Sequence, residues 1–222
     1  MTFSILARDP DTGAIGGAAA TGSYCVGGWV LRGALDAGMS ASQGAAPSTF
    51  WGEDVLAAMR AGTAAAEAVA QVVAADSGRD WRQLTALGLD GRTGAFTGAS
   101  NTPWMGSQGF ADGIAAGNLL ANDGVLGALV AGFEAAAGTF DARLLTALRA
   151  AEAAGGDRRG LMSAALLVLH PDHPPLTLRI DYHPDDPIGA LGALHRLATS
   201  GEYGAWMRQV PTAAHRARVP ES

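Results

Sequence analysis

The sequence contains no lysine, because every one of its 15 basic residues is an arginine. A lysine Schiff base, the lysine of a P-loop and a lysine general base are therefore excluded. The formal net charge is −6, and the densest positive charge is the pair Arg158 and Arg159. Since nucleic-acid binding depends on clustered Lys and Arg, we expect no nucleic-acid partner.

Cysteine and long apolar runs are also scarce. Cys25 stands alone, so it forms neither an intrachain disulfide nor a CxxC metal site, and it fits a reducing cytoplasm. Arg8 and Asp9 interrupt the first apolar run, and Glu134 interrupts the most apolar later stretch. We therefore expect a cytoplasmic protein that has no secretory signal, no membrane-spanning helix and no membrane partner.

The chain does contain enough apolar sequence for a sizeable core. Of its 222 residues, 48% are hydrophobic and 16% are charged, as is typical of a folded globular protein. A chain of this length suits one domain. We predict a single domain over residues 1–200, followed by a C-terminal tail over residues 201–222.

The first 21 residues predict a β-hairpin. The stretch TFSILARD alternates, with Phe3, Ile5 and Ala7 on one face, and the turn sequence PDTG follows it. We predict that the hairpin runs from Thr2 to Thr21. Its second half, AIGGAAATG, has almost no side-chain volume, which indicates either close contact between sheets or the floor of an active site.

The rest of the chain alternates between strand and helix signals. We predict strands over residues 37–44, 161–170 and 176–183. We also predict a hairpin over residues 83–98 and a strand of small residues that leads into Asn118. Helices are predicted over residues 51–60, 63–76 with Thr63 as N-cap, 124–137, 141–154 and 187–199, and an irregular loop over 101–113. Hairpins of strands and pairs of helices favour antiparallel sheets covered by helices over a parallel βαβ fold.

Three common kinds of site have little support. All five histidines lie in the last quarter, and no G-x-S-x-G motif exposes a serine nucleophile. HPDHPP and DYHPDDP bring imidazoles and carboxylates into neighbouring turns, but their spacing matches no recognised metal motif. GGDRRG precedes a predicted strand, whereas a phosphate-binding loop precedes a helix. We expect neither a metal nor a cofactor.

Thr2 is a candidate nucleophile. An N-terminal Thr, Ser or Cys can use its own free α-amino group as the general base for its side chain. The α-amino pKa of roughly 7.7–8.0 leaves an unprotonated fraction at neutral pH. Threonine is small enough for methionine aminopeptidase to remove Met1 before it, and a strand holds the residue rigidly. Threonine is equally an ordinary strand residue, so both interpretations stay open at this point.

Two segments carry a resemblance to a known family. MTFSILARDPDTGAIGGAAATG and AAGGDRRGLMSAALLV resemble a bacterial family without assigned function, domain of unknown function 1028, which is placed among the N-terminal-nucleophile (Ntn) hydrolases. Supporting similarity in SQGAAPSTFWGEDVLAAMRAG, AFTGASNTPWMG and AAGNLLA extends it to about Leu197. The resemblance implies an α+β fold, a four-layer αββα sandwich of two antiparallel sheets flanked by helices.

The resemblance also implies an amide hydrolase and suggests its catalytic residues. Thr2 would be the nucleophile once Met1 is removed, with its freed amine as the base. Asn118 would donate a hydrogen bond to the oxyanion. Asp157 would orient the amine or bind an amine of the substrate.

Positive charge would have to come from arginine, since relatives of the proteasome type use a lysine that this chain lacks. We expect Arg8 and Arg158, together with Ser23, to contact the substrate, with Arg32 as a further source of charge. Arginine does not shuttle protons, so its role would be electrostatic.

The expected substrate is a small amide or peptide-like molecule. Trp29, Trp51 and Trp104 lie in or near predicted loops and are candidate interface anchors, so we expect a homo-oligomer, most simply a dimer. The alternative is a catalytically silent Ntn-fold protein that binds a metabolite or assembles as a homo-oligomer. A third hypothesis places the nucleophile at Cys25 or Ser23.

Overall fold

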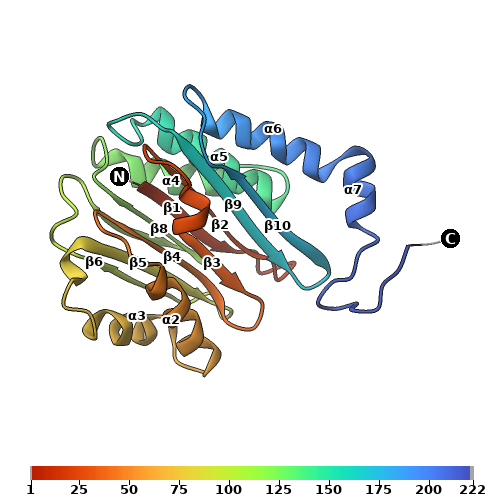
Figure 1. Ribbon diagram of the computed structural model, residues 1–222, viewed down its shortest axis with the longest axis horizontal. Helices are drawn as coiled ribbons and strands as arrows, with labels where there is room; N and C mark the ends of the chain where they lie inside the picture. Colours follow the sequence, from red (N-terminus) through yellow and green to blue (C-terminus); the bar gives the residue numbers. More distant parts are fainter. Residues whose placement is uncertain (1, 221–222) are drawn as a thin grey trace.

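The computed structural model describes residues 2–220, which form ten strands, seven α-helices and one 3₁₀ turn (Figure 1). The strands are β1 (Thr2–Arg8), β2 (Ile15–Thr21), β3 (Leu31–Ala34), β4 (Gly38–Gly44), β5 (Arg82–Gly88), β6 (Thr93–Thr97), β7 (Gly106–Phe110), β8 (Gly113–Asn118), β9 (Ser163–His170) and β10 (His173–Ile180). The helices are α1 (Val26–Trp29), α2 (Thr49–Arg60), α3 (Ala65–Ala74), α4 (Gly124–Ala135), α5 (Phe140–Ala153), α6 (Pro187–Thr199) and α7 (Gly201–Met207), and the 3₁₀ turn is Arg79–Trp81.

The strands form two antiparallel sheets. The larger sheet has the order β10-β9-β2-β1-β8-β7, and the smaller has the order β3-β4-β5-β6. The prediction of antiparallel sheets in a mixed α+β protein is therefore confirmed. β1 lies in the middle of the larger sheet, where Thr2 is opposite Thr21 of β2 on one side and Asn118 of β8 on the other.

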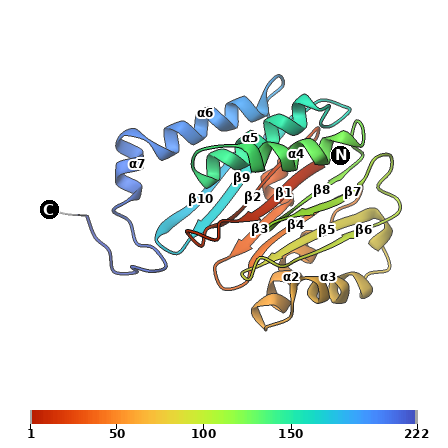
Figure 2. The ribbon, with the colours of Figure 1, turned by 180° about the vertical axis from the view of Figure 1, so that it is seen from behind.

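Three apolar cores join the sheets and the helices. Phe3 and Ile5 of β1 belong to the core between the larger sheet and the helices α4, α5 and α6. Leu6 belongs to the core between the two sheets, which also contains Met39 of β4 and Leu87 of β5. The third core joins the smaller sheet to α2 and α3. Figure 2 shows helices on the outer face of each sheet, with the sheets facing one another.

The small residues of β2 permit this close approach of the sheets. A Cβ atom on Gly17 would lie 2.7 Å from Leu6 Cδ2, 2.9 Å from the Ile5 carbonyl oxygen and 3.1 Å from Leu31 Cδ2 of the smaller sheet. Such distances are shorter than ordinary van der Waals contacts, so only glycine fits here without a shift of its neighbours. The glycine therefore serves contact between sheets, one of the two reasons inferred from the sequence.

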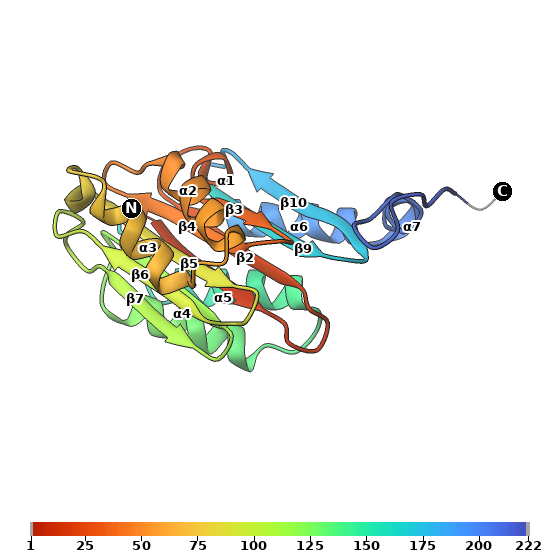
Figure 3. The same ribbon diagram turned by 90° about the horizontal axis from the view of Figure 1, so that it is seen from below.

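Four details differ from the sequence-based expectations. Gly106–Phe110 forms β7 inside the segment predicted to be an irregular loop. The N-cap of α3 is Ala64, without a side-chain cap, whereas Thr63 was predicted. Trp51 is buried in α2 against the smaller sheet, so it is no exposed anchor. The tail predicted from residue 201 begins with α7 (Figure 3), and beyond this helix it contacts the β9–β10 turn, where the Ala214 N–H donates to the Pro171 carbonyl oxygen and Arg218 pairs with Asp172.

Replacement of Gly17 by alanine should lower the free energy of unfolding by about 1–3 kcal/mol, because the new methyl group overpacks the space between the sheets. Urea denaturation would measure the loss. Gly109→Ala is the matched control in β7, since a Cβ atom there meets no atom within 4 Å. Equal stability of the two variants would contradict the close sheet contact.

A half-buried ion pair links α5 to α6. His195 Nε2 lies 2.5 Å from Asp141 Oδ2, and both side chains are largely shielded from solvent. Burial raises the pKa of Asp141, but hydrogen bonds from His195 and Thr139 and the charge of His195 outweigh it and lower that pKa to about 2. The ionised carboxylate is therefore the form that the folded protein favours.

This lowered pKa predicts a loss of stability in acid. An unfolded aspartate has a pKa near 3.9, so the contribution of Asp141 is fully present above that pH and disappears as the pH falls towards about 2. We expect Asp141→Asn to reduce the difference in unfolding free energy between pH 5 and pH 2.5, measured by urea denaturation. An unchanged difference would show that the pair contributes nothing to acid sensitivity.

Candidate functional site

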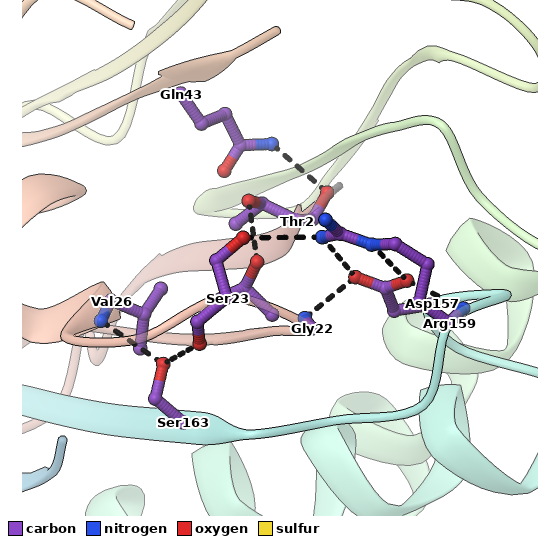
Figure 4. Close-up of polar contacts among 9 residues, drawn as sticks. Thr2, Gly22, Ser23, Val26, Gln43, Asp157, Arg159 and Ser163 are labelled. Carbon is purple, nitrogen blue, oxygen red and sulfur yellow. Dashed lines mark hydrogen bonds and ion pairs between the residues drawn. The ribbon is translucent and has the colours of Figure 1, made fainter. Parts of the chain in front are cut away.

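Thr2 begins the central strand and directs its side chain between the two sheets. Phe3 and Ile5 face the helices, so the alternation of β1 places Thr2 on the face shared with Leu6. The residue is 7% exposed. Its Oγ1 donates a hydrogen bond to Thr21 Oγ1 at 3.2 Å (Figure 4).

A pocket of about 460 Å³ opens beside Thr2. Besides Thr2, its polar lining residues are Thr21, Ser23, Gln43 and Arg159, and its larger aromatic and apolar ones are Tyr24, Val26, Trp29, Val30, Pro47 and Leu119. Arg159 carries the only full charge among these described lining residues. A small organic molecule with a polar end beside Thr2 suits such a lining.

A buried carboxylate fixes the wall of this pocket. Asp157 is 3% exposed, and its Oδ2 accepts a hydrogen bond from the Gly22 backbone N–H at 2.6 Å. Its Oδ1 accepts from the Arg159 backbone N–H at 2.9 Å, and the Arg159 guanidinium lies 3.0 Å from Oδ2 (Figure 4). Both carboxylate oxygens are therefore engaged, and the ion pair holds a positive charge at the pocket.

Ser23 lies on the loop between β2 and α1, which the neighbouring strand β9 holds in place. Arg159 Nη2 donates to Ser23 Oγ at 3.3 Å. Ser163 Oγ donates to the Ser23 carbonyl oxygen at 2.8 Å and accepts from the Val26 backbone N–H at 3.1 Å (Figure 4).

Cys25 adopts a left-handed backbone conformation with φ of 61°, which non-glycine residues seldom adopt.

Asn118 lies directly opposite Thr2 at the end of β8, and it is fully buried. Its Nδ2 donates to Asn101 Oδ1 at 3.2 Å, while its Oδ1 has no hydrogen-bond partner among the described residues. From the facing sheet, Gln43 Nε2 donates to Gln83 Oε1 at 2.7 Å and lies 3.5 Å from the Thr2 carbonyl oxygen. Amide side chains thus surround Thr2 on the inner face of the sheets.

The structure brings four of the six predicted site residues together, namely Thr2, Asn118, Asp157 and Ser23. Arg8 ends β1, about 20 Å along the strand from Thr2, and pairs with Asp112 at 2.8 Å. Arg158 is exposed and does not line the pocket.

The neighbouring Arg159 lines the pocket instead of Arg158. The pair of arginines in GGDRRG indicated that an arginine could lie at the site. Which of the two faces the pocket depends on the turn after Asp157, which the sequence alone does not reveal. Arg32 donates to the carbonyl oxygens of Leu31 and Gly28 and does not line the pocket.

A second pocket of about 540 Å³ lies at the other end of the larger sheet, beside the β9–β10 hairpin and α7. Its lining includes Asp141, whose carboxylate contacts His195. It also includes His170 and His173, whose ring centroids lie 4.6 Å apart with the rings tilted by 39°. Among residues 2–220, no three His, Cys, Asp or Glu side chains gather closely enough to hold a metal ion. Within that same range, no helix has the length and apolarity needed to cross a membrane.

The fold and the site define an α+β protein with two facing antiparallel sheets and a pocket at the first residue of its central strand. A family of unknown function (DUF1028) matches residues 2–191, and the chain belongs to this family. The crystal structure of protein SPO2555 from Silicibacter pomeroyi, described as DUF1028, is similar to this chain, with 61% sequence identity, a TM-score of 0.96 and 99% of each chain covered. No curated protein matches the sequence.

Replacement of Asp157 by asparagine should destabilise the loop that bears Arg159. The amide keeps the size of the carboxylate but turns an N–H donor towards Gly22 or Arg159, which are donors themselves. We expect the free energy of unfolding to fall by about 1–3 kcal/mol, measured by urea denaturation. Asp185→Asn, at an exposed aspartate, is the control, and equal losses in both variants would contradict the structural role of Asp157.

Proposed function

We propose that this protein is an N-terminal-nucleophile amidohydrolase that cleaves a small amide or peptide-like substrate, with Thr2 as the nucleophile after removal of Met1. The observation that carries the proposal is the position of Thr2. Its hydroxyl lies at the first residue of a central strand, between two sheets, and beside a pocket of about 460 Å³. A nucleophile on a rigid element meets the geometric demand of catalysis.

The arrangement of layers supports the same proposal. Helices, larger sheet, smaller sheet and helices stack in the order of a four-layer αββα sandwich (Figure 2). This is the architecture that the resemblance to Ntn hydrolases implies. In such enzymes the start of a strand presents the nucleophile at the edge of the layer between the sheets.

The proton transfers of the proposed reaction need only groups of Thr2 and water. The neutral α-amine takes the proton of Thr2 Oγ1 while that oxygen attacks the carbonyl carbon of the substrate. The amine then returns the proton to the leaving nitrogen, the C–N bond breaks, and an ester on Thr2 remains. The amine next takes a proton from water while the water oxygen attacks the ester carbonyl carbon. The bond from that carbon to Oγ1 then breaks, the amine returns the proton to Oγ1, and the acid is released.

Arg159 supplies positive charge in this scheme. Its guanidinium lines the pocket and is held by Asp157 and Ser23, so it stabilises negative charge without moving a proton. The substrate-binding role expected for Arg158 passes to this residue. Ser23 keeps its predicted place at the pocket.

The alternative is a catalytically silent member of the fold, and one observation favours it. Thr2 is largely buried, and its Oγ1 is engaged with Thr21 Oγ1. The half-exposed Trp29 and Trp104 would then serve ligand binding or a homodimer interface. Nucleophilic attack by Ser23 or Cys25 is a third option, tested by Ser23→Ala and by thiol alkylation.

Thr2→Ala should reduce amide hydrolysis by about a thousandfold or more in protein from which Met1 has been removed, because no other group replaces the nucleophile. Thr2→Ser should retain part of the activity, since it keeps the hydroxyl. Turnover is measured on a panel of small amides by the amine released, with intact mass confirming the loss of Met1.

Two controls test whether the loss of activity is specific to the Thr2 hydroxyl and to its free amine. Thr93→Ala, in β6 of the other sheet, should leave turnover unchanged. Protein that retains Met1 should be inactive, because a peptide nitrogen accepts no proton. Undiminished hydrolysis by Thr2→Ala would refute the assignment, and Met1 retained on all protein from the native host would favour the silent alternative.

A further inference from the structure

The backbone of β1 shows which way the nitrogen of Thr2 points. In an antiparallel strand the N–H groups of successive residues point to alternate neighbours. Arg8 N–H donates to the Asp112 carbonyl oxygen on the β8 side at 2.8 Å, and Asp9 N–H donates to the Ala14 carbonyl oxygen on the β2 side at 2.8 Å. Counting back in steps of two from Arg8, the nitrogen of Thr2 faces β8 and its register partner Asn118.

The Asn118 side chain lies on the same face of the sheet as that of Thr2, because residues directly opposite in a ladder share a face. Its amide is buried and has a defined direction. The donor end is held by Asn101 Oδ1, and the acceptor Oδ1 has no hydrogen-bond partner among residues 2–220. A buried acceptor without a partner is costly, so such an atom calls for a donor.

We propose that Asn118 Oδ1 accepts a hydrogen bond from the α-ammonium group of Thr2 once Met1 has been removed, which makes Asn118 a positioning residue for the general base; this rests on the proposed function. A peptide nitrogen carries a single hydrogen, which the ladder between β1 and β8 uses. A terminal ammonium carries three hydrogens. The contact would hold the amine beside Thr2 Oγ1 and satisfy the buried oxygen.

The role differs from the oxyanion donor that the sequence resemblance suggests for Asn118. An oxyanion requires the N–H end of the amide, and that end points to Asn101. The ammonium requires the oxygen end, which is the end left open beside the strand start. The direction of the amide therefore favours the amine as its partner.

The composition of the chain provides a selective assay. Since the sequence contains no lysine, the α-amine is the only primary amine in the protein. The rate of its acetylation by acetic anhydride, followed by intact mass from pH 5 to pH 10, reports the pKa of that single group without any substrate. The protein is the full chain with Met1 removed.

The test compares three variants with the parent protein. A neutral acceptor favours the charged amine, so Asn118→Leu should lower the labelling pKa by about one unit. Asn118→Asp places a negative charge there and should raise it by about one unit or more. Ser4→Ala removes another buried and unpartnered oxygen from β1, two residues further on, and should leave the pKa unchanged.

A purely structural role for Asn118 would leave the labelling curve of Asn118→Leu coincident with that of the parent protein, and that result overturns the inference. If Asn118→Leu fails to fold, as judged by circular dichroism, Asn118→Ala, which also removes the acceptor, takes its place in this comparison. Shifts without turnover on any amide would remove the proposed hydrolase and keep the contact. Turnover with coincident curves would keep the hydrolase and remove the contact.

Discussion

The register of β1 between β2 and β8 is the constraint on which the candidate site depends. Phe3 and Ile5 pack against the helices, and Leu6 packs between the sheets. A slip of one residue would exchange these faces and turn the Thr2 hydroxyl into the helical core. The apolar residues of the strand therefore determine where the hydroxyl points, and the small residues of β2 let the second sheet approach it.

Much of the fold could be predicted from the sequence, because alternation and turn residues act locally. The hairpin from Thr2 to Thr21 and the helix Pro187–Thr199 agree with their predicted bounds. β7 could not be predicted, since GSQGF has little strand preference and gains its structure from pairing with β8. The site was predictable in part: the loop that carries Asp157 meets Gly22 only through tertiary packing, across 135 residues of sequence.

Because the chain contains no lysine, no single side chain of that type can supply both positive charge and proton transfer at the site. Lysine can both carry charge and transfer a proton, whereas arginine stays charged and only stabilises charge. In this protein the buried Asp157 holds Arg159 at the pocket wall, which supplies a fixed charge. The proposed proton transfers then pass through the α-amine of Thr2, so that this amine is both the general base and the general acid of the mechanism.

The surroundings of Thr2 act on such an amine in opposite directions. Burial between the sheets disfavours an ammonium ion and lowers its pKa, whereas a hydrogen-bond acceptor favours it and raises its pKa. A general base is most effective with a pKa near the working pH, so neither influence alone suits the proposed reaction. An uncharged amide oxygen such as that of Asn118 offsets part of the desolvation, while a carboxylate in its place would hold the proton too strongly. In the proposed enzyme, an asparagine opposite Thr2 therefore suits a free amino terminus better than an aspartate would.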